Sequence, residues 1–536
     1  MTNLVLYILG ASLLLWLFLA QQLLTRLNTH YFLSENEITT AYSKYDRYRH
    51  RPTNWIVLAF FHFFSVFSLS FFVSMMISVM YGLVISAIYV FLGTLFISFP
   101  LNFFGLHLGA IEKTESPLRL LSQKKSTQAV LLVYLILFAT FSIITFSLLL
   151  VNFLPYEKEI IFVMGFSIFF LFFEGWTRFS ESSFSLLGVI LLIGALMCGI
   201  FFQQNILGDR FAEYLVLASV LLMVLAYTKL SSSTQRISFL LLASTTIAFF
   251  LILANQAITV HPINKLNELT KLLDRQNLNE IFVFANLDDR VFLFLPVIMI
   301  PSVSSGFLAI LSWQSTAKQI RFDSDIPHVS YLSTFLLVTA QYLVLAFAFS
   351  VRNSIPIGGS FSLLDDFLPA IFHTEYETLI YIAITYMTFL IIVPTFQLAD
   401  ASINSLSPNR VLKGIFYLFI GGGVFLVSSQ YENKDIFLFF VLFGSASVGV
   451  TAIYMSLARS YFKSEGWGIQ LLTLIALLLF ISSIAGFLLV GFNMVPSEFP
   501  HALNMQFVTS RFLLFLLAII ASILEFILII RILTRK

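Results

Sequence analysis

The chain has 536 residues, of which 59% are hydrophobic, 11% are charged and 62 are phenylalanine. Soluble domains carry about 25% charged residues, so a soluble fold of this size would lack the charges that its surface needs. The surplus of apolar side chains therefore has to face lipid. A formal net charge of +2 suggests no nucleic-acid partner, and the single cysteine, Cys198, allows no disulfide within the chain and no thiolate metal site.

Long apolar runs follow one another along the whole chain, and about 20 such residues are enough for a helix to cross the hydrocarbon. A β-barrel would instead need alternating segments of about 10 residues. We therefore predict an all-α polytopic membrane protein, with a single transmembrane domain over residues 1–536 and about 15 helices. The predicted spans are 2–25, 54–80, 82–111, 128–153, 160–176, 184–203, 212–228, 237–260, 291–313, 331–351, 378–396, 412–429, 436–458, 466–492 and 507–532.

The basic residues predict how the chain is oriented. No basic residue precedes the first apolar run and Arg26 follows it, which is typical of a retained first helix with its N-terminus outside. Fifteen spans then place the C-terminus and the loops after odd-numbered spans in the cytoplasm. Together with Lys413 and Arg531 at the cytoplasmic ends of adjoining spans, these pieces hold 21 of the 30 Lys and Arg residues. This bias follows the positive-inside rule. We expect a multi-pass protein of the cell inner (cytoplasmic) membrane.

The longest extracytoplasmic loop is predicted at residues 261–290. Leu266, Leu269, Leu272 and Leu273 fall on one side of a helix there, so an amphipathic helix at the outer interface is expected. No loop is long enough for a soluble domain, which puts the working part of the protein inside the membrane.

Several common kinds of chemistry have no signature in the chain. There is no P-loop, no HExxH motif and no pair of histidines at the i, i+4 spacing of a helical zinc site. We therefore expect no enzymatic activity, no metal and no cofactor. Haem ligation by two spans is the alternative kept open, with His62 and His107 as the histidines inside predicted spans.

Acidic residues in or near the spans are functional hypotheses, because a charge at a helix centre costs about 2.5–3.5 kcal/mol on insertion scales. Glu174 and Glu525 lie toward predicted cytoplasmic helix ends. We expect them to be carboxylates that reach interfacial water, with a proton site as the alternative. Asp400 ends a span that contains Pro394, and it is interpreted either as part of an ordinary helix terminus or as part of a site.

The segment 296–325 contains the strongest signal for a site. Pro296, Pro301 and Gly306 interrupt the helix, and Ser302, Ser304 and Ser305 supply hydroxyl groups beside the freed backbone carbonyls. Broken helices of this kind line substrate and ion sites in secondary transporters. The alternative is a simple kink in a packed helix.

At this segment the chain resembles the carbon-starvation family, which has a stretch reading approximately FPxxFxxxACGAxSGFHxxxSSGTTxKQ. The residues that match in order are Leu295-Pro296, Ser304-Ser305-Gly306-Phe307, Ser312 and Ser315-Thr316-Ala317-Lys318-Gln319, with Asp325 where the family has an acidic residue before its next helix. Further similarities are Arg51-Pro52-Thr53-Asn54 with His62, Ala218-Ser219-Val220-Leu221, Thr395 with Asp400, and Leu442-Phe443-Gly444-Ser445-Ala446. The resemblance covers about residues 50–460.

The departures from the family pattern follow one trend. The family's Gly-His-His becomes Phe60-Phe61-His62, and its glycine- and proline-rich continuation becomes Ser65–Ser70. The Gln-Asp pair of its third helix becomes Asn102-Phe103, and its late Asn-Gln pair is lost near Val448-Gly449. Since glycine and proline allow unwound backbone in the membrane, this chain has either a more apolar site or a scaffold that no longer transports.

The resemblance implies a LeuT-like core of two inverted five-helix repeats with peripheral helices, and proton-driven uptake of pyruvate or small peptides. The predicted substrate- or ion-binding residues are His62, Ser302, Ser304, Ser305, Gly306 and Asp400. The expected partners are the lipid bilayer and a small organic acid or peptide. The alternatives are a transport-inactive membrane sensor or scaffold subunit, which would bind a protein partner, and a lipid-active enzyme, which the lack of clustered histidines and carboxylates opposes.

Overall fold

The computed structural model describes residues 2–31, 55–56, 58–60, 62–63, 83–111, 130, 133–134, 320, 325–351, 449, 452–453, 455–456, 459, 467–491 and 512–534. Apart from Ile320 and Thr534, every residue in these ranges is helical. The all-α prediction is therefore confirmed for the part of the chain that the structure describes. The count of about 15 helices, the inverted repeats and the loop 261–290 involve residues outside these ranges and stay predictions.

The named elements are α1 (Thr2–Tyr31), α4 (Leu83–Gly93), η1 (Thr94–Ser98), α5 (Phe99–Ile111), α14 (Asp325–Val351), α19 (Trp467–Gly491) and α21 (Phe512–Leu533). They coincide with five predicted spans, since α4, η1 and α5 form one continuous helical segment. By length and composition, two stretches of the described residues can cross a membrane, Ser86–His107 and Asp325–Leu345.

Helix α14 begins at Asp325, six residues before the predicted span at 331. The prediction treated the polar residues Asp325, His328 and Ser330 as a loop. The first turn of a helix favours an acidic side chain, because the free amide groups there carry partial positive charge. It also tolerates Pro327, whose missing N–H would have had no partner within the helix.

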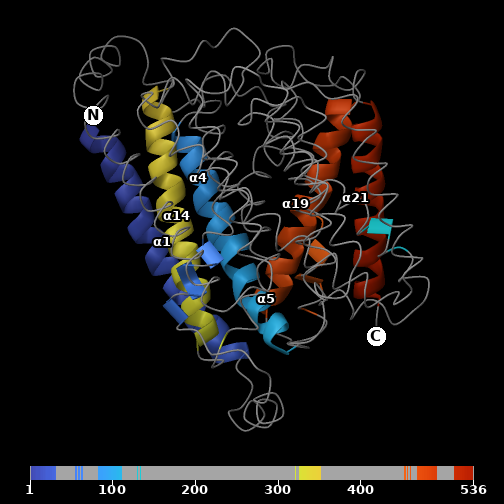
Figure 1. Ribbon diagram of the computed structural model, residues 1–536, viewed down its shortest axis with the longest axis horizontal. Coiled ribbons are helices and arrows are strands. Elements are labelled where there is room, and N and C mark those ends of the chain that lie inside the picture. The colour runs from blue at the N-terminus through green and yellow to red at the C-terminus, as the bar shows by residue number, and fades with distance from the viewer. Residues whose placement is uncertain are drawn as a thin grey trace, which may run out of the picture.

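Helix α14 packs against α1, α4 and α5, and Figure 1 shows these helices side by side. The centre of this group is Trp16 of α1, which is fully buried. Its ring lies 6.3–6.4 Å from the rings of Phe99, Tyr331 and Phe335, and its indole N–H donates a hydrogen bond of 3.1 Å to Thr94 Oγ1. Trp16 therefore joins α1, η1, α5 and α14 in one packed core.

The α4–α5 segment contains one wide turn, η1, in which the amide of Phe99 donates to the carbonyl of Thr94 instead of to a residue four positions back. Pro100 accounts for the position of this turn. It has no N–H to donate, and in a regular α-helix its ring would collide with the carbonyl of Phe96. Such π-helical turns are rare and often occur at functional sites, and the sequence analysis did not predict this one.

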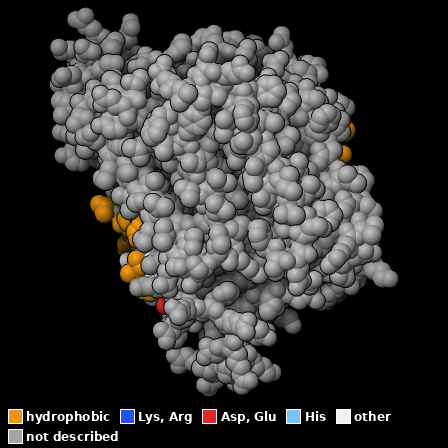
Figure 2. Space-filling view, in the orientation of Figure 1, with side chains coloured by type: hydrophobic (Ala, Val, Ile, Leu, Met, Phe, Trp, Pro, Cys, Tyr) orange, Lys and Arg blue, Asp and Glu red, His pale blue; other side chains and the backbone are white. Residues whose placement is uncertain are grey.

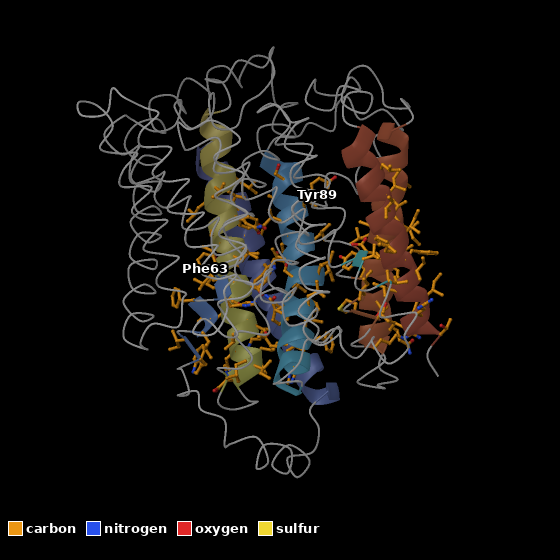
Figure 3. The ribbon with its side chains drawn as sticks, turned by 45° about the vertical axis from the view of Figure 1, so that its right-hand side comes forward. Phe63 and Tyr89 are labelled. Carbon is orange, nitrogen blue, oxygen red and sulfur yellow. The ribbon has the colours of Figure 1, made fainter. Side chains whose placement is uncertain are left out.

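Helices α19 and α21 contact each other, and α19 also contacts η1. Figure 1 shows them on the side of the α4–α5 segment opposite to α1. In Figure 3, Tyr89 projects from α4 toward this second pair. Both helices have two faces with helical spacing: on α19, Thr473, Ala476 and Phe480 are buried, whereas Leu471, Leu474, Leu478 and Ile481 are exposed.

The outer surface of the described helices is strongly apolar. Leu14 and Phe18 of α1 are 69% and 60% exposed, and Leu343 of α14 and Ile523 of α21 are about half exposed. Figure 2 shows hydrophobic side chains on two opposite flanks of the molecule. Large apolar groups that point outward from several helices are typical of a surface that faces lipid.

We expect Trp16→Ala to destabilise the protein by about 3–5 kcal/mol, because it leaves a cavity and removes the hydrogen bond to Thr94. Thermal unfolding in detergent measures this loss as a large fall in Tm. Phe18→Ala is the matched control on the same helix, since that ring is exposed, and it should change Tm little. An equal loss for the two variants would contradict the central position of Trp16.

Candidate functional site

Polar side chains gather between α5, α14 and a short segment whose described residues, 55–56, 58–60 and 62–63, are helical, inside an otherwise apolar region. They are 0–2% exposed, so water does not solvate them. The residues are His62, Ser98, Asn102, Ser330 and Thr334, here called the His62 cluster. Buried polar groups in membrane helices are expensive and usually functional, so this cluster is the first candidate site.

A chain of hydrogen bonds connects three helical segments in the cluster. His62 Nε2 lies 3.2 Å from Asn102 Oδ1, Asn102 Nδ2 donates to Thr334 Oγ1 at 3.0 Å, and the hydroxyl of Thr334 donates to the carbonyl of Ser330 at 2.8 Å. In this chain the side-chain amide of Asn102 directs its oxygen to His62 and its nitrogen to Thr334. His62 Nε2 must then carry a hydrogen and donate it to Asn102 Oδ1.

A second contact holds the segment that carries His62 against α14. The ring of Trp55 packs on that of His328, in the second turn of α14, with centroids 5.4 Å apart. In Figure 3, Phe63, the neighbour of His62, appears at the side of the bundle where α14 lies. The contact at Trp55 and the hydrogen-bond chain at His62 together fix the position of this segment along α14.

Two hydroxyl groups of the cluster, Ser98 Oγ and Ser330 Oγ, are buried and have no hydrogen-bond partner within the described part of the chain. Ser98 is the last residue of η1 and lies about one turn before Asn102, and Ser330 lies one turn before Thr334. Unsatisfied buried polar groups are rare in native structures, and an unseen water or ligand is a common reason for them. The cluster thus offers hydrogen-bonding capacity that the described residues do not use.

A second polar group lies at α21. Glu525 is fully buried, and the hydroxyl of Tyr134 donates a hydrogen bond of 2.9 Å to its Oε1. Figure 1 shows the short segment that includes Tyr134 lying against α21. Its other oxygen, Oε2, has no hydrogen-bond partner among the described residues and faces the backbone of Gly449, where an added Cβ would lie 1.9 Å from it. We call Glu525, Tyr134 and Gly449 the Glu525 site.

The expectation that Glu525 reaches interfacial water is therefore wrong. Glu525 lies on the buried face of α21 with Ala521, Leu528 and Ile532, while Ile523, Phe526 and Ile530 form the exposed face. That expectation rested only on the distance of the carboxyl from the helix end. Its position around the helix axis decides its environment, and that position turns it toward the protein.

Of the predicted site residues, the structure describes His62 alone, at the centre of a polar cluster. Ser302, Ser304, Ser305, Gly306 and Asp400 lie outside the described residues, and so does Glu174. The structure brings His62 together with Asn102, the position that replaces a glutamine of the family pattern. Thr334 was missed, although Ser330, Ser333 and Thr334 have the i, i+3, i+4 spacing of a polar face in an apolar helix.

The described residues contain no group of three or more His, Cys, Asp or Glu side chains that could hold a metal ion. His107 contacts the ring of Phe103 at 4.8 Å between centroids, whereas His62 bonds to Asn102. Because Nε2 of His62 donates in that bond, this nitrogen has no lone pair to offer. The contacts of these two histidines give no support to the alternative of a shared haem.

We expect Asn102→Ala and Thr334→Val to be energetically coupled, since both remove the same hydrogen bond. Side-chain hydrogen bonds between membrane helices contribute about 0.6 kcal/mol on average and up to about 1.7 kcal/mol. A double-mutant cycle on unfolding in detergent should give a coupling energy in this range.

Thr339→Val is the control for this cycle. Thr339 also donates to the carbonyl four residues back on α14, that of Phe335, and its effect should add to that of Asn102→Ala within about 0.5 kcal/mol. If Asn102→Ala were coupled to Thr339→Val as strongly as to Thr334→Val, the coupling would not arise from the hydrogen bond between Asn102 and Thr334.

The family model of the carbon starvation protein CstA matches residues 5–357, about two thirds of the chain. The match begins earlier than the predicted range of about 50–460 and ends before the elements at Thr395 and Leu442, which stay predictions. It includes His62, Asn102, Tyr134 and Thr334. A search of curated proteins finds none that matches this chain.

Proposed function

Because the chain belongs to the carbon-starvation protein family, and is thus a membrane protein, we propose that it is a divergent secondary transporter. Its proposed substrates are pyruvate or small peptides, and uptake is driven by protons. The proposed location is the cell inner membrane, with the N-terminus outside and the C-terminus in the cytoplasm. The His62 cluster is the observation that carries the proposal.

A core that only holds the helices together would be more stable without this cluster. Apolar side chains of similar volume pack without the desolvation cost that His62, Asn102 and Thr334 incur. Two serine hydroxyl groups of the cluster also have no partner among the residues that the structure describes, which has no benefit for packing. Hydroxyl groups of this kind can bind a polar substrate reversibly. This supports transport over a purely structural role.

Pyruvate and a peptide both carry a carboxylate, which accepts hydrogen bonds from hydroxyl groups and from a protonated imidazole. In the proposed mechanism Ser98 and Ser330 donate to the substrate, together with Ser302, Ser304, Ser305 and the backbone near Gly306. His62 or Asp400 carries the proton. A histidine that takes up a second proton becomes cationic and attracts the carboxylate, so proton and substrate strengthen each other's binding.

The alternative is a transport-inactive scaffold or sensor subunit, and one observation favours it. Phe99, Phe103 and Phe104 of α5 are all at most 1% exposed, so bulky rings fill the core next to the His62 cluster. Such packing suits a helix that stays fixed. In this case a protein partner would replace the substrate.

The test is uptake of labelled pyruvate and dipeptides into proteoliposomes with an imposed inward proton gradient. We expect gradient-dependent uptake by the wild type. His62→Asn, Asp400→Asn and Ser305→Ala should each reduce it by about tenfold or more, equivalent to about 1.4 kcal/mol. His107→Asn is the matched control, because this histidine lies on α5 outside the cluster, against the ring of Phe103.

Wild-type uptake that His62→Asn reduces and His107→Asn does not would support the transporter and its site. Well-folded protein that takes up neither substrate class, with or without the gradient, would overturn the proposal. A stoichiometric protein partner that co-purifies in that case would identify the scaffold alternative.

A further inference from the structure

The Glu525 site has features that the proposed transport mechanism does not use. Glu525 and Gly449 lie beyond residues 5–357, the range that matches the family model. The carboxyl group is fully buried, and one of its oxygens bonds to Tyr134 whereas the other has no partner within the described residues. Glu525 therefore has a buried oxygen atom, Oε2, that can still bind a ligand or a proton.

The charge balance around Glu525 decides what it can bind. Among the described residues, Tyr134 is the titratable group in contact with it. Helix α19, which packs on α21, contains no charged residue and no histidine between Trp467 and Gly491. Arg531 is six residues further along α21, and Arg459, ten residues after Gly449, is exposed.

A carboxylate with no cation beside it is costly to bury, and such a group either becomes neutral or binds a cation. A metal cation such as Na⁺ would need several oxygen ligands around Oε2. The described residues hold no group of three or more His, Cys, Asp or Glu side chains that could bind one, and on the side of Gly449 there is no room, because an added Cβ would overlap the carboxyl oxygens. A C–H group cannot be a ligand, whereas a proton needs no further space.

We propose that Glu525 is a proton-binding site, at which the carboxyl group takes up a proton and releases it again as the protein changes state. Tyr134 orients the carboxyl through its hydrogen bond to Oε1. Gly449 permits the helix that carries it to approach Oε2 closely. Proton binding as such does not depend on the proposed transport, but its role in coupling uptake to the proton gradient rests on that function.

The direct test is infrared difference spectroscopy of the full-length protein in liposomes, between mildly acidic and mildly alkaline buffer without sodium. A protonated carboxylic acid has a C=O stretching band that the carboxylate lacks. We expect such a band to appear on acidification in the wild type and to be lost in Glu525→Gln. The control Asp325→Asn, which removes a half-buried carboxyl at the start of α14, should keep the band.

Two further variants separate this site from a buried carboxyl elsewhere in the chain. Tyr134→Phe should shift the band to higher frequency, because a C=O group that loses a hydrogen bond becomes stiffer. Gly449→Ala should shift it as well, since the added Cβ forces the carboxyl to move. A matched control is Gly10→Ala, where an added Cβ meets nothing within 4 Å, and its spectrum should equal that of the wild type.

A wild-type band that does not respond to pH would mean that the carboxyl is a fixed structural group, and would overturn the proposal. A pH-dependent band that persists in Glu525→Gln would overturn it too, because another residue would then bind the proton. If sodium added at acidic pH abolishes the band, the carboxyl binds a metal cation in place of the proton. None of these results depends on whether the protein transports anything.

The coupling role has a separate readout in proteoliposomes. Glu525→Gln should retain exchange of labelled for unlabelled substrate at equal pH but lose accumulation driven by a proton gradient. Absence of both activities in the wild type would contradict the proposed transport and leave the spectroscopic result standing. Gradient-driven accumulation that is unchanged in Glu525→Gln would remove Glu525 from the coupling step.

Discussion

The hydrocarbon of a membrane offers no hydrogen-bond partner, so buried polar groups have to bond to one another. The described helices are arranged around such groups. His62, Asn102 and Thr334 come from three separate helical segments, yet each bonds to the next. None of them would be stable facing lipid. The bonds therefore fix both the rotation of α5 and α14 about their axes and the depth at which His62 and its helical segment lie beside them.

The apolar packing adapts to the same requirement. Trp16 fills the space between α1, η1 and α14, and its indole N–H is satisfied by Thr94 in the wide turn of η1. That turn arises just before Pro100, where a regular helix would be disrupted. At the other side of the α4–α5 segment, Gly449 lets a helix approach the carboxyl of Glu525. In both places a backbone irregularity or a missing side chain makes room for a buried polar contact.

Much of this could be predicted from the sequence and some could not, for definite physical reasons. Apolar length predicted the helices α1, α14, α19 and α21 because the bilayer sets the length of a span. Hydropathy could not place Glu525, since a window average ignores the direction in which a side chain points. The contact between His62 and Asn102 joins residues 40 positions apart, and that to Thr334 spans 232 positions. Local patterns do not contain such pairs, although the family resemblance had singled out both His62 and Asn102.

The central claim is that the His62 cluster, buried in this structure, is a working site that opens to water and substrate in another state of the protein. The most direct measurement is the reaction of Ser330→Cys, in a background without Cys198, with a small membrane-impermeant thiol reagent. Leu337→Cys, on the same helix and 1% exposed, is the control. The account predicts that Ser330→Cys reacts, that substrate protects it, and that Leu337→Cys stays unreactive. The account would be contradicted if, in folded protein, Ser330→Cys reacted no faster than Leu337→Cys, whether or not substrate is present.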